Sequence, residues 1–337
     1  MNKVFFGDCR DTMRDLIAQG VKVQMCVTSP PYFGLRDYGH PGQLGLEATP
    51  AEFVAAMVEV FALVRELLAD DGVLWLNLGD SYSNGGRKTR DPGQSKLHPA
   101  FTGEDNAVTT FRPDDGAKPK DLLGIPWRVA FALQADGWYL RQDIIWHKPN
   151  PMPESVTDRC TKAHEYLFLL SKSERYYFDA RAIAQPIAES SKERLAQPNL
   201  PNQAGSDRVP GKTNGNMKAV GPRFGGNKYG DDDREESRTK SGNEYTGGDG
   251  LANRRSVWTV PTVPYSGAHF ATFPPALIEP CILAGSRSGD TVLDPFFGSG
   301  TTGEVAGNFG RNWIGCEIND QYAPLQQART AQRGLAL

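Results

Sequence analysis

The sequence Val23-Gln24-Met25-Cys26-Val27-Thr28-Ser29-Pro30-Pro31-Tyr32 joins an apolar run to a turn stiffened by two prolines. The apolar run is typical of a short buried strand. Consecutive prolines neither continue a strand nor enter a helix, so the chain must leave the strand in an extended turn. That turn presents the Ser29 hydroxyl, the Pro30 carbonyl and the Tyr32 ring, which suit a planar base carrying an exocyclic amino group. An ordinary proline-stiffened loop is the alternative at this point.

A strand and a helix precede this turn. Residues 3–6 (Lys-Val-Phe-Phe) have the pattern of a strand that ends at Gly7-Asp8, and residues 9–19 that of a short helix. Strand, helix and strand in this order indicate a parallel sheet with helices on its faces. Ligands gather at the carboxyl ends of such strands, where Asp8 and Ser29 fall. Asp8 is therefore a candidate for ligand contact, while a role as helix cap stays equally open.

The strongest helix signal lies at residues 49–68. Thr49 and Glu52 form a capping box at its start, and apolar residues then recur at helical spacing. We expect this helix to end at Asp71-Gly72 and residues 73–78 to form the next buried strand.

The middle of the chain alternates between patterned and unpatterned segments. Residues 122–135 predict a helix, residues 139–146 a strand, and residues 159–178 a pair of strands. Residues from about 83 to 120 and residues 185–255 lack apolar periodicity. Neither can bury enough apolar surface alone to offset the cost of ordering, so we expect both to be mobile when free.

Residues 291–302 (Thr-Val-Leu-Asp-Pro-Phe-Phe-Gly-Ser-Gly-Thr-Thr) predict a strand, a glycine loop and the start of a helix. Gly298 and Gly300 let the backbone approach a ligand closely. Neither G-x-x-x-x-G-K-[ST] nor G-x-G-x-x-G is present, so a nucleoside without phosphates fits this loop better than a nucleotide. Glu317 ends the next strand about twenty residues later, where a carboxylate can accept hydrogen bonds from a ribose diol.

Composition limits the class of protein. The 337 residues are 39% hydrophobic and 23% charged, with a net charge of −3, as in an ordinary globular protein. The five cysteines have no paired spacing, so we expect neither a disulfide framework nor a metal site, and a reducing cytoplasm as the location. No run approaches the ~20 apolar residues of a membrane span, so we expect no membrane partner.

Residues 28–32 and 294–302 together resemble the signature motifs of amino-group DNA methyltransferases that depend on S-adenosylmethionine. A catalytic loop early in the chain and a cofactor loop late resemble the β class of that family. Further segments match it as well: Gly7-Asp8, Asp80, Trp146 to Asn150, Lys162 to Tyr166 and His269 to Pro274. The resemblance implies an α/β fold with a Rossmann-like, mostly parallel sheet, helices on both faces, a permuted motif order and a large irregular insert.

The resemblance also implies roles for individual residues. Ser29, Pro30, Pro31 and Tyr32 would receive the target base. Glu317 would hold the ribose hydroxyls of the cofactor. The full set implied to bind S-adenosylmethionine is Asp8, Phe273, Asp294, Pro295, Phe296, Gly298, Gly300, Thr301 and Glu317, with Asp294 near the amino group of the cofactor and Asp8 near its adenine.

Three regions follow from this assignment. Residues 1–184 would form the catalytic part of the methyltransferase domain, including the loop at about 83–120. Residues 185–255 would form a largely irregular insert that recognises the target sequence. Residues 256–337 would complete the same domain as its cofactor-binding part.

The expected activity is methylation of cytosine N4 in double-stranded DNA, after the base is flipped out of the helix. Serine in the catalytic motif is more usual in the cytosine-N4 enzymes of the family, whereas the adenine-N6 enzymes usually carry an acid there. A neutral hydroxyl can serve either amino group, so adenine N6 stays open, as do an RNA methyltransferase and a non-catalytic DNA-binding module. A cognate restriction endonuclease is a further partner that the sequence leaves undecided.

Overall fold

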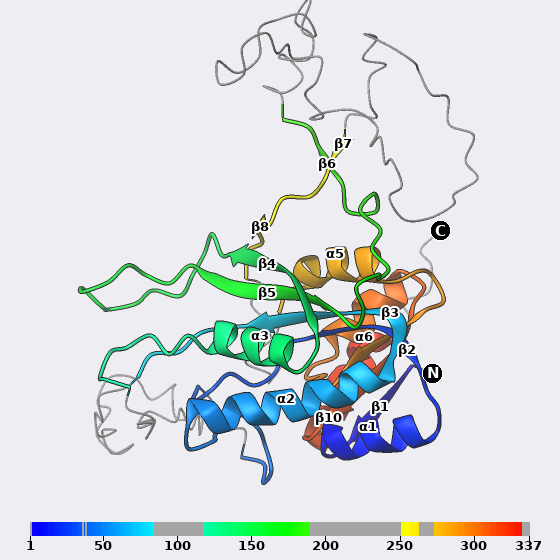
Figure 1. The fold of residues 1–337 in the computed structure, drawn as a ribbon, viewed down its shortest axis with the longest axis horizontal. Helices are drawn as coiled ribbons and strands as arrows, with labels where there is room; N and C mark the ends of the chain where they lie inside the picture. Colours follow the sequence, from blue (N-terminus) through cyan, green and yellow to red (C-terminus); the bar gives the residue numbers. More distant parts are fainter. Residues whose placement is uncertain are drawn as a thin grey trace, which may run out of the picture. The chain divides into compact units, whose positions relative to one another are not determined.

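The computed structural model describes most of the chain, and most of its strands form one main sheet (Figure 1). The residues described are 2–35, 37, 39–83, 117–188, 251–262 and 273–331. The strands are β1 (Lys3–Phe6), β2 (Val23–Thr28), β3 (Leu68–Leu78), β4 (Tyr139–His147), β5 (His164–Ser171), β6 (Gln185–Pro186), β7 (Leu251–Ala252), β8 (Val257–Thr259), β9 (Thr291–Asp294) and β10 (Asn312–Glu317). The helices are α1 (Cys9–Ala18), α2 (Pro50–Leu67), α3 (Ile125–Ala135), α5 (Pro275–Gly285), α6 (Thr301–Asn308), the 3-10 turn η5 (Asp320–Tyr322) and α7 (Ala323–Thr330).

Among the described residues, eight strands form one sheet in the order β1-β10-β9-β2-β3-β5-β4-β8. Strand β5 runs antiparallel to its neighbours β3 and β4, and the other pairings in this sheet are parallel. The first and the late strands of the chain lie next to each other, because β1 pairs with β10, and β9 pairs with β2. The mostly parallel sheet expected from the sequence is confirmed, and its strand order brings the early and late motifs to one edge.

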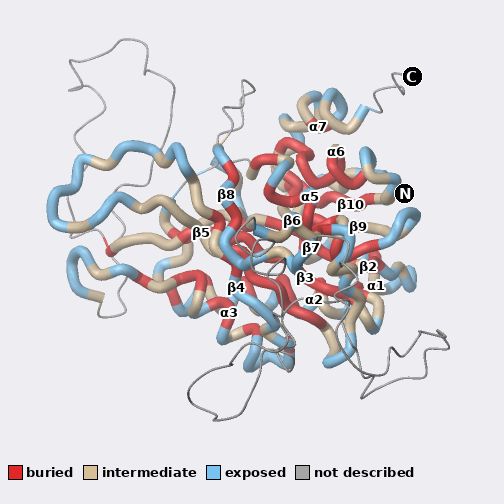
Figure 2. Tube along the Cα trace, turned by 90° about the horizontal axis from the view of Figure 1, so that it is seen from above, coloured by how far each residue is buried: buried red, intermediate tan, exposed pale blue. Residues whose placement is uncertain are grey.

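Helices cover both faces of this sheet (Figures 1 and 2). Helices α1, α2 and α3 lie on one face, and α5, α6 and α7 lie on the other. The sheet between them is buried along most of its length, and the large core on the first face includes Met13, Phe53, Phe61 and Leu74, none of them exposed to solvent. Burial of apolar surface on two faces is what a parallel sheet requires.

Helix α2 begins as expected but ends earlier. The hydroxyl of Thr49 accepts from the backbone of Glu52, and the Glu52 carboxylate accepts from the backbone of Thr49, so the capping box is confirmed. The predicted end at Asp71-Gly72 is wrong, because the helix stops at Leu67 and β3 starts at Leu68. Leu68 is fully buried beside Val23 of β2, and this pairing in the sheet overrides the helical spacing of the apolar residues.

The region of residues 159–178 holds one strand instead of the predicted pair. Strand β5 covers only His164–Ser171, and it pairs with β3 and β4. Its partners therefore come from elsewhere in the chain, which apolar patterning alone does not reveal.

The chain divides into two compact units, one made of residues 1–182 and 255–337 and the other of residues 183–254. Within the second unit, the described residues include the antiparallel pair β6–β7. The unpatterned segments of the sequence fall largely outside the described residues, as do His269 to Thr272. No helix in the described ranges is long and apolar enough to cross a membrane.

Candidate active site

The two sequence motifs meet where the neighbouring strands β2 and β9 end. Thr28, the last residue of β2, donates its hydroxyl to Asp294 Oδ1 at 2.6 Å, across 266 residues of chain. The same oxygen accepts from the backbone N–H of Phe296 at 3.0 Å, and Oδ2 accepts from the Thr302 hydroxyl at 2.6 Å. Asp294 therefore ties the end of β2 to both sides of the glycine loop.

The Asp294 side chain is almost fully enclosed, at 1% exposure. Burial raises the pKa of this carboxyl from 3.8 to about 6, and the bonds from Thr28, Thr302 and Phe296 lower it only in part. All three hydrogen-bond donors to this carboxylate are groups of the protein itself. In this geometry Asp294 holds the loop in place, and its expected position near the amino group of the cofactor stays a prediction.

The glycine loop follows β9 and leads into α6. Gly298 and Gly300 have φ of 51° and 90°, left-handed conformations that favour glycine. The Gly298 N–H donates to Glu317 Oε2 at 2.8 Å, and Asn319 N–H donates to Oε1 at 2.9 Å. Burial raises the pKa of Glu317. Pro295 and the buried Thr301 lie at the two ends of this loop.

Phe297 anchors the loop, a role that the sequence interpretation missed. Its ring stacks on Trp313 of β10 with centroids 5.0 Å apart. The ring also lies directly over the Cα positions of Gly303 and Gly315, where any Cβ would collide with it. The signal was Gly315, since an isolated glycine in an apolar strand often marks a close approach of another group. Phe296, which was singled out instead, is only partly buried.

The catalytic motif forms the turn directly after β2. Pro30 is buried and Ser29, Pro31 and Tyr32 are partly exposed. The Ser29 hydroxyl donates to the Tyr32 hydroxyl at 3.4 Å. The Tyr32 ring lies against Gly79 after β3, and a Cβ at residue 79 would fall 2.5 Å from its Cε2 atom. Gly79 therefore sets the position of the ring, a role that was not foreseen.

A cluster of polar side chains from three further elements surrounds the Tyr32 hydroxyl. This hydroxyl donates to Glu165 Oε2 of β5 at 2.6 Å and lies 3.1 Å from Asn77 Oδ1 of β3. Asn77 Nδ2 donates to the same Glu165 oxygen at 3.2 Å. Lys148, just after β4, forms an ion pair with Glu165 Oε1. Residues 148 and 165 lie in segments that match the family, and the hydrogen bonds that join them to Tyr32 are a finding of the structure.

Asp8 caps helix α1, which was one of its two expected roles. Its Oδ1 accepts from the backbone of Arg10 at 2.8 Å, and the Arg10 side chain bonds both carboxylate oxygens. The bond from Arg10 lowers the pKa of Asp8. Asp8 follows β1, beside β10 and Glu317, so it lies on the same edge of the sheet as the glycine loop. Phe273 lies two residues before α5, and its expected role at the cofactor pocket stays a prediction.

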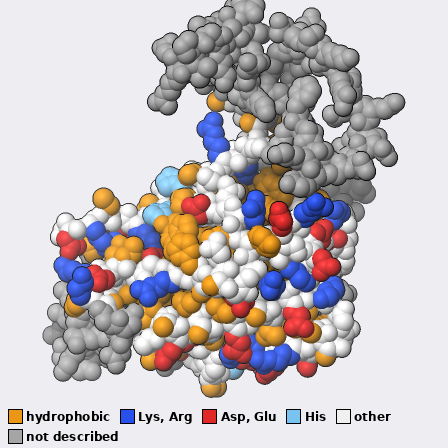
Figure 3. Space-filling model, viewed as in Figure 1, with side chains coloured by type: hydrophobic (Ala, Val, Ile, Leu, Met, Phe, Trp, Pro, Cys, Tyr) orange, Lys and Arg blue, Asp and Glu red, His pale blue; other side chains and the backbone are white. Residues whose placement is uncertain are grey.

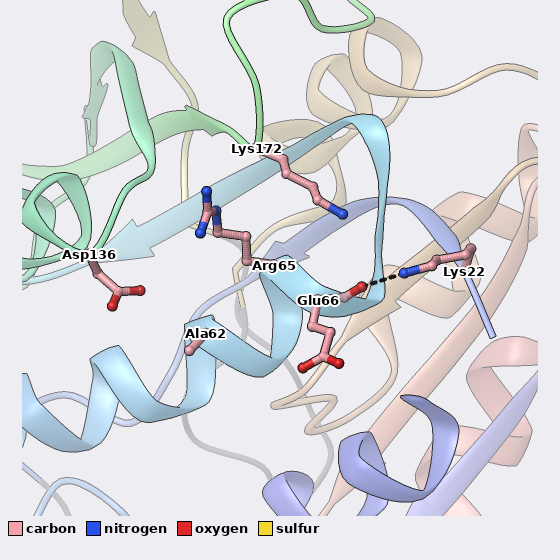
Figure 4. Close-up of a pocket in the computed structure, with 6 residues that line it drawn as sticks. All are labelled: Lys22, Ala62, Arg65, Glu66, Asp136 and Lys172. Atoms are coloured by element: carbon pink, nitrogen blue, oxygen red, sulfur yellow. Dashed lines mark hydrogen bonds between the residues drawn. The ribbon is translucent and has the colours of Figure 1, made fainter. Parts of the chain in front are cut away.

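The surface offers two further observations. On the face in Figure 3, basic and acidic side chains are interspersed over the described residues. A depression lined by Lys22, Ala62, Arg65, Glu66, Asp136 and Lys172 lies at the opposite, amino-terminal edge of the sheet (Figure 4). Lys22 donates to the Glu66 carbonyl and Lys172 to the Leu68 carbonyl, so these lysines serve the fold.

The sequence matches the DNA methylase family that acts on amino groups at N6 and N4, over residues 23–328. The chain belongs to this family. It is 41% identical to the type II methyltransferase M.SmaI of Serratia marcescens over 98% of this chain and 91% of that protein. It is 44% identical to the type II methyltransferase M.Cfr9I of Citrobacter freundii over 96% and 85% of the two chains.

The fold is similar to that of PvuII DNA methyltransferase, described as cytosine-N4-specific, with a TM-score of 0.56. That match has 16% identity and covers 99% of this chain and 88% of the other. The protein is thus a type II DNA methyltransferase of the N4/N6 family, and its methyl donor is S-adenosylmethionine.

The residues at the glycine loop fit this donor. Each oxygen of Glu317 is bonded to one backbone N–H, which leaves further lone pairs for the hydroxyls of a ribose. The left-handed glycines lie in the loop that follows β9, next to the carboxyl end of β10, and this edge is where parallel sheets bind nucleosides.

Proposed function

We propose that this DNA methyltransferase modifies the exocyclic N4 amino group of cytosine. The observation that carries the proposal is the neutral Ser29 in the turn after β2, with its hydroxyl proton directed to Tyr32. A hydroxyl oxygen has two acceptor lone pairs besides its proton, so Ser29 Oγ can accept an N–H of the base. An acid would stand at this position in most adenine-N6 enzymes of the family.

The amino nitrogen of cytosine is a poor nucleophile because its lone pair is delocalised into the ring. Ser29 Oγ and the Pro30 carbonyl would accept its two N–H groups, so that the nitrogen becomes pyramidal and regains its lone pair. Bound S-adenosylmethionine supplies an electrophilic methyl group on sulfur. Catalysis by these residues is then a matter of positioning and of fixed dipoles, without a covalent intermediate.

The cofactor would lie along the edge formed by β1, β10 and β9. Glu317 would bind the ribose hydroxyls, and Gly298 and Gly300 would pass close to the methionine portion together with Phe296. Asp8 would contact the adenine side, where its carboxylate is oriented by Arg10. Pro295, Thr301, Phe273 and Asp294 complete the proposed binding set, with Asp294 near the amino group of the cofactor and bonded to the hydroxyls of Thr28 and Thr302.

Access to the base requires that it leave the DNA helix. Unstacking costs a few kcal/mol, which contacts to the DNA must offset. We place these contacts in residues 185–255, the proposed target-recognition insert, with Tyr32 stacking on the flipped base. Residues 1–184 and 256–337 would then act as one catalytic domain. A restriction endonuclease blocked by the same methyl mark is the partner to be sought for a type II enzyme.

The direct test is nucleoside analysis. Purified protein is incubated with S-adenosylmethionine and enzymatically amplified, unmethylated duplex DNA of mixed sequence, and the digested nucleosides are identified by mass spectrometry. N4-methylcytosine is expected from the wild type and should fall by about 100-fold in Ser29→Ala, the range typical of a lost dipolar contact in a transition state.

Other products have defined meanings. N6-methyladenine would keep the chemistry and overturn the choice of base. No product from DNA, with methyl transfer to RNA, would overturn the substrate class, and cofactor binding without any transfer would indicate a binding module. Equal turnover of wild type and Ser29→Ala would remove Ser29 from the mechanism.

A further inference from the structure

The hydrogen bonds of the polar cluster around the Tyr32 hydroxyl all run toward one acceptor, the Glu165 carboxylate. The Ser29 hydroxyl donates to Tyr32 at 3.4 Å, and the Tyr32 hydroxyl donates to Glu165 Oε2 at 2.6 Å. Asn77 and Lys148 also donate to this carboxylate. A carboxylate only accepts, so the hydrogen bonds from the proposed base-contacting serine converge on Glu165.

Charged and amide groups hold Glu165 where Tyr32 can reach it. Its side chain is 14% exposed and that of Lys148 is 19% exposed, so the ion pair is largely shielded from water. Lys148 also lies over the Trp146 ring, 4.3 Å from its centroid. Asn77 is 2% exposed and bonds both the Glu165 side chain and the Tyr166 carbonyl. None of these contacts explains why a carboxylate is needed at the end of the chain of hydroxyls.

Methylation of an amino group creates such a need. When the N–CH3 bond forms and the S–CH3 bond breaks, sulfur keeps the bonding electron pair and the nitrogen is left with one proton too many. This proton must leave for the neutral methylamino base to form. The lone pair of this exocyclic nitrogen is delocalised into an electron-poor ring, so the protonated nitrogen is a strong acid and transfer of its proton to a carboxylate is favourable.

We infer that Glu165 receives this proton through Tyr32 and Ser29. The nitrogen gives a proton to Ser29 Oγ, Ser29 gives its own to the Tyr32 hydroxyl, and Tyr32 gives its own to Glu165 Oε2. Both hydroxyls end as they began, and the carboxylate ends protonated before it releases the proton to solvent. Glu165 touches neither the base nor the cofactor. This inference rests on the proposed function, since it requires Ser29 at the amino group.

Lys148 and Asn77 would be positioning residues in this relay. The lysine pairs with one oxygen of the carboxylate, and the amide fixes the other oxygen, which faces Tyr32. Lys172 (Figure 4), at the opposite edge of the sheet, provides a matched control. Its side chain is 20% exposed and donates to the Leu68 carbonyl. Lys148→Met should slow methyl transfer, whereas Lys172→Met should not.

The test compares single-turnover methyl transfer in Glu165→Gln, Tyr32→Phe and the double variant, with tritiated S-adenosylmethionine and mixed-sequence duplex DNA. General-base contributions of this kind are typically about 100-fold or more. We expect each single variant to lose about 10-fold to 100-fold in rate, with cofactor and DNA affinities unchanged and little further loss in the double variant. Asp71→Asn, which removes a remote carboxylate bonded to Gln24, is the control.

A second readout separates proton transfer from simple support of Tyr32. Acetate added to Glu165→Ala should restore part of the rate, and it should do nothing for Tyr32→Phe, which lacks the connecting hydroxyl. A Glu165→Gln rate within twofold of wild type would overturn the relay. Additive losses with no rescue by acetate would overturn it too, leaving Glu165 a packing residue. In both cases an intact effect of Ser29→Ala would leave the proposed function standing, whereas loss of the Ser29 effect would remove both.

Discussion

The two halves of the main sheet bond their carboxylates in different ways. On the β9–β10 side, Glu317 accepts from two backbone N–H groups, and Asp294 accepts from one backbone N–H and two threonine hydroxyls. On the β3–β5 side, Glu165 accepts from the side chains of tyrosine, asparagine and lysine. Glu317 is held by backbone donors and Asp294 is enclosed at 1% exposure, so both belong to a rigid scaffold, whereas Glu165 lies at the end of a chain of hydroxyl groups that can pass a proton to it.

From this difference we expect the two halves of the sheet to have different roles. The β9–β10 side should determine whether the loop is formed and the cofactor binds, and the β3–β5 side should determine how fast the methyl group is transferred. Variants on each side should therefore differ in whether they change stability, cofactor affinity or rate.

The largest effect is expected from Asp294→Asn. One of the two acceptor oxygens is lost, and the Thr28 and Thr302 hydroxyls and the Phe296 N–H share the other. Hydrogen bonds to a charged group are worth about 1.5–3 kcal/mol, so we expect a loss of about 3 kcal/mol in the free energy of unfolding and weaker cofactor binding. Chemical denaturation at pH 7 and calorimetric titration measure both, with Thr302→Ser as the control that keeps the hydroxyl.

The stability cost of Asp294→Asn should depend on pH, because the wild-type carboxyl titrates and the amide does not. The folded-state pKa of Asp294 is about 6, above its ordinary 3.8, because burial disfavours the charge. The folded state therefore binds the proton more tightly, and this stabilisation is present at low pH and lost as the pH rises through about 6. The cost of Asp294→Asn should grow by about 1 kcal/mol from pH 7 to pH 5. A cost that shrinks over this range would contradict the assignment.

A smaller effect, confined to the other half, is expected from Gly79→Ala. The new methyl group would fall 2.5 Å from the Tyr32 ring and displace its hydroxyl from Glu165. We expect a loss of about 10-fold to 100-fold in single-turnover rate, since misplacing a catalytic contact by about 1 Å can cost about 100-fold, with an unchanged Kd for the cofactor. Gly307→Ala in α6, where a Cβ meets open space, should keep the wild-type rate. An intact rate in Gly79→Ala would show that the position of the ring does not matter.

The smallest effect is expected from Thr49→Ala, which should change stability alone. Thr49→Ala removes one bond of the capping box of α2 and should cost about 1 kcal/mol of stability. Rate and affinity should not change, because the box is remote from both loops. Thr49→Ser should restore the stability, and a loss of activity in Thr49→Ala would mean that α2 is coupled to the site.

Features encoded by neighbouring residues could be predicted from the sequence. The capping box needs only Thr49 and Glu52, and the glycine loop needs only the residues from 294 to 302. The position of Glu317 followed from one strand and its end. In each case a short segment carries its own geometry, so composition and spacing were sufficient.

Features that depend on the strand order could not be predicted in this way. The bond between Thr28 and Asp294 spans 266 residues, and the one between Tyr32 and Glu165 spans 133. The second exists because β5 inserts antiparallel between β3 and β4, which turns its amino end toward the catalytic turn. Nothing in the local pattern of β5 specifies that direction.

The most direct test of the division of labour is a paired measurement on Glu317→Gln and Ser29→Ala. The Kd for S-adenosylmethionine and the single-turnover rate at saturating cofactor are determined for both variants. The account predicts a raised Kd with a nearly normal rate for Glu317→Gln, and a normal Kd with a rate about 100-fold lower for Ser29→Ala. Both variants losing affinity and rate to the same extent, or the opposite assignment of the two effects, would contradict it.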